Sequence, residues 1–397
     1  MVTGTSMKIV AKNVLSRQRD SFQAGRQAAE EIRASLAQPP KLLLCYLTVN
    51  HDQQRFLAGL AEVLGSALPL IGCSGQGVMG RGAVHEDGYA ASVMALGGDA
   101  LEVAVTRVDE VQNDTHAKGR RLGSSLRSAL SRPPQVTLLH YDPLSGVDLN
   151  PLLAGLNQEL EGPILGGAAA HFFGAALTTT YQYFGQEVFS HGAVAVSLAG
   201  DFSTEMVWST GCAPVGIDME VTRTAGNMLL ELNGRPALTV WQEATGAVGK
   251  ADVQAVSSLA IGVPPQPGEQ GHLIRAAFVF DPDAKGILLS AAVPTGTRVT
   301  LFHRTVEDVL EGAARMGREL SERLQGKQLC AVLGFECGGR TRPFLGVEAT
   351  NQENIALQAA VGPDAEWGGV ICWGELFPVG GRPAFHNYAF PLLALAQ

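Results

Sequence analysis

Four side chains near the C-terminus have the chemistry to bind a small ligand or to attack one. Cys337, Arg340, Glu375 and His386 come from three separate predicted turns. A guanidinium and a carboxylate each make charge-assisted hydrogen bonds, which suits a ligand with a carboxylate or an amino group. If these turns meet at one edge of a sheet, the four residues form a shared ligand pocket.

Two other interpretations of the same residues remain open. Arg340 and Glu375 can pair with each other to satisfy a partly buried turn, with Cys337 simply packed nearby. Alternatively, Cys337 is the nucleophile of a thiol enzyme and His386 activates it, which requires hydrogen-bond reach and an oxyanion site. Nothing in the spacing requires that geometry, so we expect a binding protein rather than an enzyme.

A glycine-rich segment formally matches a dinucleotide-binding pattern. Gly75, Gly77 and Gly80 give G-x-G-x-x-G after a predicted strand. That pattern binds a pyrophosphate only if a helix follows and presents its N-terminal amides. The next periodic segment, residues 88–96, alternates like a strand, so we expect these glycines to permit a sharp turn between strands.

The elements that position these residues are predicted by an internal repeat. The segment that opens at Gly25 recurs at Gly119 with the same helix length and the same Pro-Pro pair, and the later Gly72 recurs at Gly166 at a similar offset. A third, weaker copy begins at Gly312. Each copy predicts a helix, a buried strand, a second helix and two further strands.

We therefore predict an α/β protein of two domains with mixed β-sheets flanked by helices. The order of strand, helix and strand implies a right-handed parallel crossover, after which the last strand returns antiparallel. Residues 1–222 are expected to hold two repeats and residues 223–397 the third. Within residues 223–397, ahead of the third copy of the repeat, we expect a leucine-rich helix within 223–246 and a loop at 253–267. Three further strands are expected at 274–280, 286–292 and 297–302.

The composition indicates a globular chain with a large core. Hydrophobic residues make up 46% of the 397 residues and charged residues only 17%, which argues against a disordered chain. The net charge is -9 and the basic residues are scattered, so we expect no nucleic-acid partner. Six cysteines without a C-x-x-C pair favour a reducing cytoplasm over a disulfide or zinc framework. We expect no membrane insertion, because no apolar run is long enough.

The closing stretch resembles the C-terminal FIST domain. That domain's pattern is roughly F-x-C-x-G-R, then G-x-x-x-x-G-E-[IL], then H-N, and residues 335–340, 369–376 and 386–387 match it in order. Upstream, residues 69–74 and 166–169 resemble the glycine turns of the N-terminal FIST domain. The resemblance covers roughly residues 40–390.

The resemblance implies a function and a set of candidate residues. FIST domains are regarded as intracellular sensory modules that bind small ligands. We expect this chain to bind one at the edge where its glycine turns meet and to signal by contact to a separate protein, such as a histidine kinase. The candidate ligand-binding residues are Cys73, Ser74, Cys337, Arg340, Trp373, Glu375, His386 and Asn387.

One bacterial branch of the family is associated with haem and with nitric-oxide sensing, which makes haem b a possible cofactor. His171 is the candidate axial ligand, since residues 168–170 and 172–173 are small or aromatic and haem requires an apolar cavity. The competing histidines are His140, His191 and His386. A lone histidine in such a setting is more often a hydrogen-bonded core residue. Covalent haem attachment is not expected without C-x-x-C-H.

Overall fold

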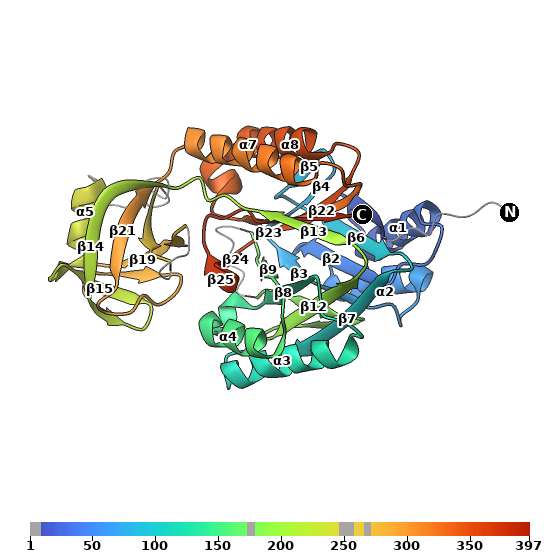
Figure 1. Cartoon of the computed structure of the whole chain (residues 1–397), viewed down its shortest axis with the longest axis horizontal. Coiled ribbons are helices and arrows are strands. Elements are labelled where there is room, and N and C mark those ends of the chain that lie inside the picture. The colour runs from blue at the N-terminus through green and yellow to red at the C-terminus, as the bar shows by residue number, and fades with distance from the viewer. Residues whose placement is uncertain (1–8, 173–178, 246–257, 266–270) are drawn as a thin grey trace.

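The computed structural model describes residues 9–172, 179–245, 258–265 and 271–397. Within them the chain forms three similar α/β units and an inserted β domain, which lies at one end of the molecule (Figure 1). The predicted α/β class, with mixed sheets flanked by helices in two domains, is confirmed.

The first unit has the predicted order of helices and strands. Its elements are β1 (Val10–Ser16), α1 (Ser21–Ser35), β2 (Leu42–Thr48), α2 (Gln53–Leu64), β3 (Leu70–Gly75), β4 (Gly77–Gly80), β5 (Ala83–His85) and β6 (Ala91–Gly97). Asp20 and Asp52 accept backbone N–H groups in the first turns of α1 and α2, which fixes where these helices begin. Every residue of β2 is buried, as expected for a central strand covered on both faces.

The second and third units repeat this order. The second contains β7 (Leu101–Val108), α3 (Thr115–Ala129), β8 (Val136–Tyr141), a 3-10 turn (Pro143–Ser145), α4 (Leu149–Glu159), β9 (Ile164–Ala168), β10 (Gln182–Phe184), β11 (Glu187–Phe189) and β12 (Ala193–Gly200). The third contains β13 (Ser203–Val207), α7 (Val306–Arg323), β22 (Leu329–Cys337), a π-helical turn (Thr341–Leu345), α8 (Gly346–Val361), β23 (Glu366–Cys372), β24 (Glu375–Val379), β25 (Arg382–His386) and β26 (Leu392–Ala396).

The insertion lies between β13 and α7 of the third unit. It contains β14 (Ala213–Ala225), β15 (Met228–Leu232), β16 (Arg235–Pro236), α5 (Ala237–Thr245), β17 (Leu259–Val263), β18 (Leu273–Arg275), β19 (Ala277–Asp281), β20 (Gly286–Leu289) and β21 (Arg298–His303). Of the three strands expected after residue 273, the second and third are present as β20 and β21, and the first is divided at Ala276 into β18 and β19. The predicted domain boundary at 222/223 falls inside β14. The first strand of the third unit, β13, lies before that boundary. The division into residues 1–222 and 223–397 stays a prediction.

Three local predictions meet different outcomes. The leucine-rich run Met228–Leu232 is a strand that pairs with β14 and β20 and buries Leu229 and Leu232 in the core of the insertion, and the helix begins only at Ala237. The loop predicted at 253–267 is wrong where the structure describes it, since it contains β17. The turn predicted after Gly75 is confirmed: β4 follows it instead of a helix, so no helix N-terminus is available to a pyrophosphate there.

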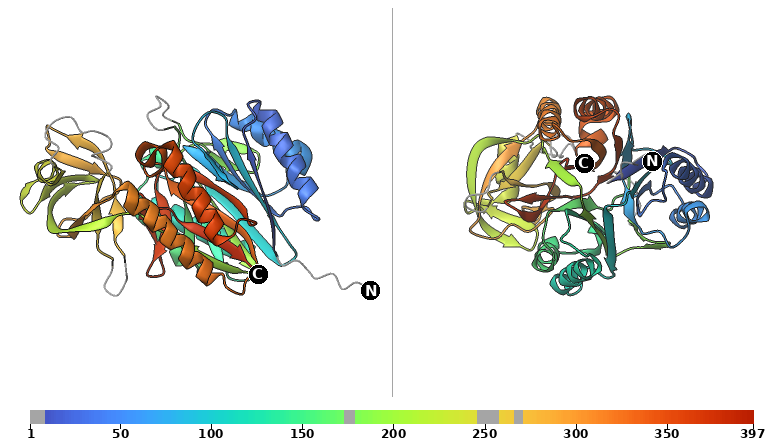
Figure 2. Two further views of the ribbon diagram at one scale, coloured as in Figure 1. Left: turned by 90° about the horizontal axis from the view of Figure 1, so that it is seen from above. Right: turned by 45° about the vertical axis from the view of Figure 1, so that its right-hand side comes forward.

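Each unit donates a hairpin to the sheet of another unit. The sheet orders are β1-β6-β2-β3-β10-β11, β7-β12-β8-β9-β24-β25 and β13-β26-β22-β23-β4-β5. The hairpin of the first unit thus joins the third unit's sheet, that of the second joins the first, and that of the third joins the second. This cyclic exchange locks the three units together, and their helix pairs lie on the outside (Figure 2).

Glycines at repeated positions allow the close packing that defines each unit. A Cβ on Gly25 of α1 would lie 2.1 Å from the carbonyl oxygen of Phe56 in α2, and Gly119 meets Leu152 of α4 at the same distance. In the sheets, Gly72, Gly166 and Gly369 occupy the same register against the preceding parallel strand. These constraints explain why the landmarks of the repeat are glycines.

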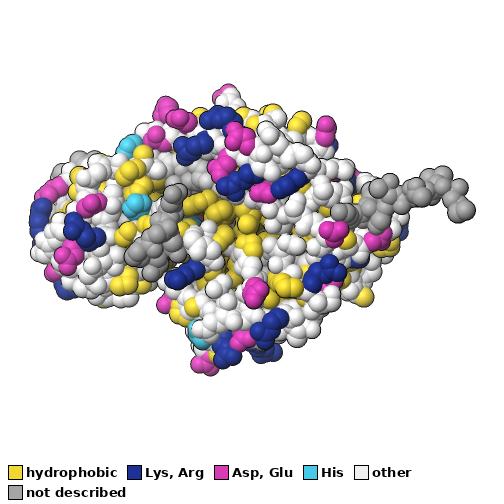
Figure 3. Space-filling model, in the orientation of Figure 1, with side chains coloured by type: hydrophobic (Ala, Val, Ile, Leu, Met, Phe, Trp, Pro, Cys, Tyr) yellow, Lys and Arg dark blue, Asp and Glu magenta, His cyan; other side chains and the backbone are white. Residues whose placement is uncertain are grey.

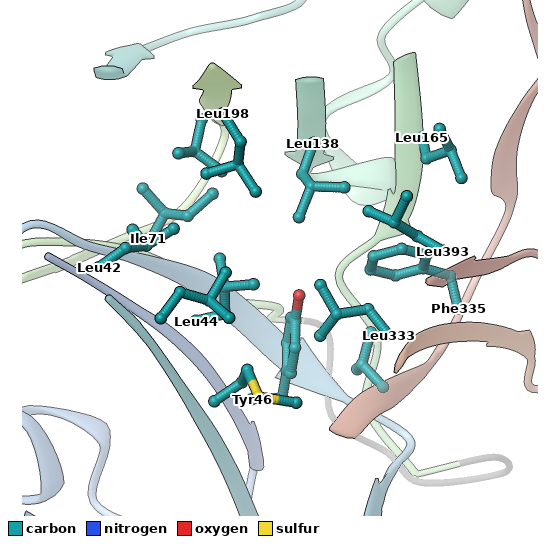
Figure 4. Packing of buried hydrophobic residues seen from close by; sticks show 14 of the residues in the cluster. Leu42, Leu44, Tyr46, Ile71, Leu138, Leu165, Leu198, Leu333, Phe335 and Leu393 are labelled. Atoms are coloured by element: carbon teal, nitrogen blue, oxygen red, sulfur yellow. The ribbon is translucent and has the colours of Figure 1, made fainter. Parts of the chain in front are cut away.

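Three rings meet where the sheets face one another. The register places Tyr46, His140 and Phe335 at equivalent positions of β2, β8 and β22. The Tyr46 hydroxyl and His140 Nε2 are 3.1 Å apart, and the rings of His140 and Phe335 lie 5.7 Å apart. Figure 4 shows Tyr46 and Phe335 among leucines from all three units. This shared core fixes how the turns at the strand ends are oriented.

Candidate functional site

A cavity of about 510 Å³ lies where the insertion meets the second and third units. The second unit contributes Tyr141, Leu144, Asp148 and Asn150. The third unit contributes Cys337, Gly339, Trp373, Phe385, Asn387 and Tyr388. The insertion contributes Asn227, Ala276, Phe278, Ser290, Ala291 and Ala292. On the face seen in Figure 3, hydrophobic side chains gather between the insertion and the units. The volume is in the range of small-molecule sites.

The wall from the third unit is built by the turns after β22 and β23. Cys337 and Cys372 end these parallel strands as register partners, and Gly338 N–H donates to the carbonyl of Cys372 at 2.8 Å. Gly374 has a positive φ of 99°, and a Cβ there would lie 2.4 Å from the Phe385 ring. Only glycine therefore fits between Trp373 and Glu375.

Gln76 from the first unit holds Trp373 in place. Its Oε1 accepts the indole N–H of Trp373 at 3.0 Å, while its Nε2 donates to the carbonyl of Gly338 and to the carboxylate of Glu86. A Cβ on Gly338 would lie 2.3 Å from Gln76 Oε1. The buried side-chain amide of Gln76 thus joins the turn after β3 of the first unit to the turns after β22 and β23 of the third unit.

Glu375 lies directly behind the wall and is fully buried. Its two carboxylate oxygens accept the backbone N–H groups of Gly374 and Ala389, at 3.0 and 3.1 Å. Burial nevertheless raises the pKa of this carboxyl to about 8, and the Cys337 thiol is one of its hydrogen-bond partners. Near neutral pH the site therefore holds a largely protonated carboxyl beside a thiol.

The Cys337 thiol is not activated as a nucleophile. Burial first, and then the Glu375 carboxylate, raise the pKa of this thiol well above its usual value. The expected base, His386, has its Nε2 3.2 Å from the carbonyl oxygen of Phe377 and its ring packed 4.3 Å from that of Trp208. Burial lowers the pKa of His386 to about 3.

Arg340 is placed away from the cavity. Its guanidinium is fully buried, hydrogen-bonds to Glu353 of α8 and lies 3.5 Å from Glu336. The pair expected between Arg340 and Glu375 is wrong, because Glu353 and Glu336 supply the carboxylates instead. A guanidinium held this way in the interior is not available to a ligand in the 510 Å³ cavity.

Asn387 joins the cavity wall to the insertion. Its Oδ1 accepts the backbone N–H of Ala276 at 3.0 Å and the hydroxyl of Ser290, and its own N–H donates to the carbonyl of Ile274 at 3.2 Å. Arg275 adds a hydrogen bond to the carbonyl of Phe385 at 2.8 Å. The residues that line the cavity thus also fasten the insertion to the third unit.

The two candidates of the first unit lie elsewhere. Cys73 is buried in the core between the sheets. Ser74 donates to the carbonyl of Ala170 at 2.8 Å and accepts the N–H of Tyr181, so its hydroxyl holds neighbouring backbone in place. Of the eight predicted residues, Cys337, Trp373 and Asn387 line the cavity and Glu375 lies behind it. Arg340, His386, Cys73 and Ser74 do not line it.

The histidine proposed for haem is adjacent to this wall but does not line the cavity. His171 Nδ1 lies 3.0 Å from the carbonyl of Phe172, and its ring packs 4.3 Å from that of Trp373. If Nδ1 carries the proton, Nε2 keeps the lone pair that an iron ligand needs. The side chain is only 7% exposed, and residues 173–178 lie outside the described part. His140 has both ring nitrogens in hydrogen bonds.

Sequence reasoning missed the aromatic and helical part of the wall. Tyr141 ends β8, Leu144 follows in the next turn, and Asp148 and Asn150 begin α4. For Tyr141 the repeat offers a signal. Tyr141 ends the second copy's strand at the position where the third copy's strand ends with Glu336 and Cys337, so the site predicted at Cys337 could have been extended to Tyr141. Phe278 of the insertion has no counterpart in the repeat, so no periodic signal pointed to it.

Comparison with known proteins identifies the family. The model of the FIST N domain matches residues 41–235, and that of the FIST C domain matches residues 237–378. The chain belongs to the FIST family. FIST domains are small-ligand-binding sensory domains of signal transduction, and this FIST protein has that general character. None of the described helices is long and apolar enough to cross a membrane.

Relatives of this FIST protein occur in bacteria and archaea. An uncharacterized protein of Mycobacterium tuberculosis is 28% identical over 380 residues, which cover 93% of this chain and 95% of the relative. One from Methanocaldococcus jannaschii is 23% identical over 226 residues, which cover 54% of this chain and 42% of the relative. Among solved structures, a cyanuric acid hydrolase from A. caulinodans aligns over 98% of this chain and 99% of its own, at 10% identity and a TM-score of 0.37.

Proposed function

We propose that the 510 Å³ cavity is the ligand site of this FIST protein and that its occupancy is passed on through the insertion. The observation that carries the proposal is that the walls of the cavity come from different parts of the chain. One wall comes from the insertion, and the others come from the second and third units. A ligand there touches both sides of a boundary. It can therefore favour one arrangement of the insertion over another by binding that arrangement more tightly.

The hydrogen bonds across this boundary give the coupling a physical route. Asn387 contacts Ala276 and Ser290 with its side chain and lines the cavity itself. Phe278 is 61% exposed and Leu144 is 42% exposed, although both line the cavity. Closure of the insertion on a ligand would bury these two side chains, and burial of apolar surface favours the closed arrangement.

A separate signalling protein reads this change in the proposed mechanism. A histidine kinase is the class of partner that the family resemblance suggests, and we place the pair in the cytoplasm. Catalysis by Cys337 is the weaker proposal, because its thiol is protonated and His386 is engaged elsewhere. Haem on His171 remains a separate prediction, which the absorption spectrum of protein expressed with haem would test.

Amide hydrogen exchange tests the coupling. The uncharged dye N-phenyl-1-naphthylamine, added at saturation, should slow exchange in residues 274–290 and 385–388 and leave α1 unchanged. The same dye added to Ala292→Trp, in which an indole fills the cavity mouth, should produce no such slowing. Saturable binding at the cavity without any change in these two segments would refute transmission through the insertion.

A further inference from the structure

Among the described residues, the cavity lining contains no group that could neutralise an anionic ligand. Its described residues include no lysine, arginine or histidine. Two arginines approach the wall from behind, but both point into the protein. Arg275 donates to the carbonyl of Phe385, and Arg304 donates to the carbonyl of Gly339 at 2.6 Å. An anion that entered would lose its hydration without gaining a cationic partner.

An acidic side chain in the described lining of the cavity disfavours an anion further. Asp148 lines it directly, and its carboxylate already accepts the N–H of Asn150 at the start of α4. Like charges at this range raise the free energy of a bound anion.

A cationic ligand meets the opposite obstacle. Five rings line the cavity, and two of them already have a guanidinium stacked on one face. The guanidinium carbon of Arg304 lies 3.6 Å from the centre of the Tyr388 ring, and that of Arg275 lies 5.4 Å from the centre of the Phe385 ring. These two ring faces are therefore not available for a cation–π contact with a ligand.

The cavity lining therefore favours a ligand that has an uncharged ring and polar substituents. Tyr141, Trp373 and Phe278 offer ring surface with no arginine stacked on it in the described structure, and rings pack well against other rings. Asn150, Asn227 and Ser290 supply neutral hydrogen-bonding groups around them. This combination selects a ligand that needs hydrogen bonds but no counter-charge.

We infer that the ligand of this cavity is an uncharged aromatic compound with hydrogen-bonding substituents, and not a carboxylate, phosphate or ammonium compound. This inference rests on the proposed function, because it takes the cavity to be the ligand site. It replaces the carboxylate- or amino-bearing ligand expected from Arg340, since that side chain is committed to Glu353.

Three aromatic probes of different charge separate the charge classes. N-phenyl-1-naphthylamine is uncharged, 8-anilinonaphthalene-1-sulfonate adds an anionic group to the same skeleton, and N-methylquinolinium is a cation. Fluorescence titration gives the Kd of the first two, and displacement of the uncharged dye gives that of the cation. We expect the uncharged dye to bind at least about ten-fold more tightly than either ion, a difference of about 1.4 kcal/mol.

A charge-adding variant makes the test specific to this site. Asn150→Arg places a guanidinium at the exposed edge of the cavity, and it should tighten binding of the sulfonate several-fold relative to binding of the uncharged dye. Ala292→Trp should weaken the uncharged dye by ten-fold or more.

The possible outcomes separate the two claims. If an ionic dye binds as tightly as the uncharged one and Ala292→Trp abolishes that binding, the cavity is still the ligand site and the inferred ligand class is wrong. If no dye is sensitive to Ala292→Trp, both the ligand class and the proposed function are overturned.

Discussion

At the residue scale, the walls of the cavity are held in place by a few buried polar side chains. Cys337, Trp373 and Asn387 were predictable as site residues, because they end or follow strands in a motif-rich stretch. Arg340 could not be placed, since its partners Glu336 and Glu353 come from a strand and a helix that the pattern does not connect. Spacing indicates which turns exist but not which carboxylate a guanidinium meets.

The raised pKa of Glu375 predicts how stability changes with pH. The folded carboxyl holds its proton up to about pH 8, whereas the unfolded one loses it near pH 4.3. The folded state thus binds more protons in this window, so the free energy of unfolding falls as the pH rises. Between pH 6.5 and 8 we expect a loss of about 2 kcal/mol from this group.

Denaturant unfolding of wild type and Glu375→Gln at pH 6.5, 7 and 8 measures that contribution. The glutamine variant should lose the Glu375 share of the slope and keep a share from Glu336, whose pKa burial also raises. Buried histidines with lowered pKa values act below this window, because their unfolded pKa is about 6.5. Equal slopes in the two proteins would show that Glu375 is ionised in the fold.

The protonated state of Cys337 predicts slow alkylation. With its pKa raised by burial and by Glu375, the thiol carries little thiolate at pH 8, and thiolate is the reactive form. We expect iodoacetamide to modify Cys337 at least ten-fold more slowly than free glutathione, as measured by mass spectrometry of the cysteine peptides. A rate equal to or above that of glutathione would support the thiol-enzyme alternative instead.

At the element scale, repeated spacing predicted the helices and strands of the first two units well. Helix α8 is predicted by the repeat alone and not by its own apolar pattern, because its apolar and polar faces are reversed. Val347 and Ile355 are exposed by 53% and 50%, while Glu353, Asn354 and Gln358 are buried and hydrogen-bonded. A search for apolar periodicity cannot find a helix that packs by polar contacts.

The helix pairs give a stability prediction. In Gly25→Ala the new methyl group would overlap the carbonyl oxygen of Phe56, so α1 and α2 must separate. The intrinsic preference of helices for alanine favours the variant by about 1 kcal/mol, yet we expect a net loss of about 2 kcal/mol or more in unfolding free energy.

Gly97→Ala is the matched control for this change. A Cβ there has its nearest neighbours at 3.4 to 3.6 Å, which is ordinary contact, so the loss should stay below about 1 kcal/mol. Denaturant unfolding of both variants provides the comparison. A Gly25→Ala protein as stable as Gly97→Ala would contradict the close packing of α1 against α2.

At the scale of the whole molecule, the cyclic exchange of hairpins and the site of the insertion lay beyond prediction. Residues 77–85, 182–189 and 375–386 form the exchanged hairpins, and nothing in their sequence says which sheet they join. Partner choice depends on the packing of all three units together. The location of the cavity follows from this choice, since β24 and β25 bring Phe385 and Asn387 to the second unit's sheet.

The contacts of Asn387 predict how firmly the insertion is held. Asn387→Ala removes the acceptor for Ala276 N–H and the Ser290 hydroxyl, at a cost of about 1–3 kcal/mol. We expect amide exchange in β19 and β20 to rise about ten-fold, with α1 unchanged. Asn387→Asp keeps the acceptor oxygen and should stay near wild type. Equal protection of these strands in all three proteins would show that other contacts hold the insertion.

The central claim is that the space between the insertion and the units is a ligand site. The most direct measurement is the Kd of N-phenyl-1-naphthylamine for two tryptophan variants of the insertion. Both alanines are exposed, but Ala292 lines the cavity, whereas Ala284 lies in a turn of the same domain and does not. We predict that Ala292→Trp weakens binding by ten-fold or more and that Ala284→Trp leaves it within two-fold of wild type. Equal affinity of the two variants would contradict the account.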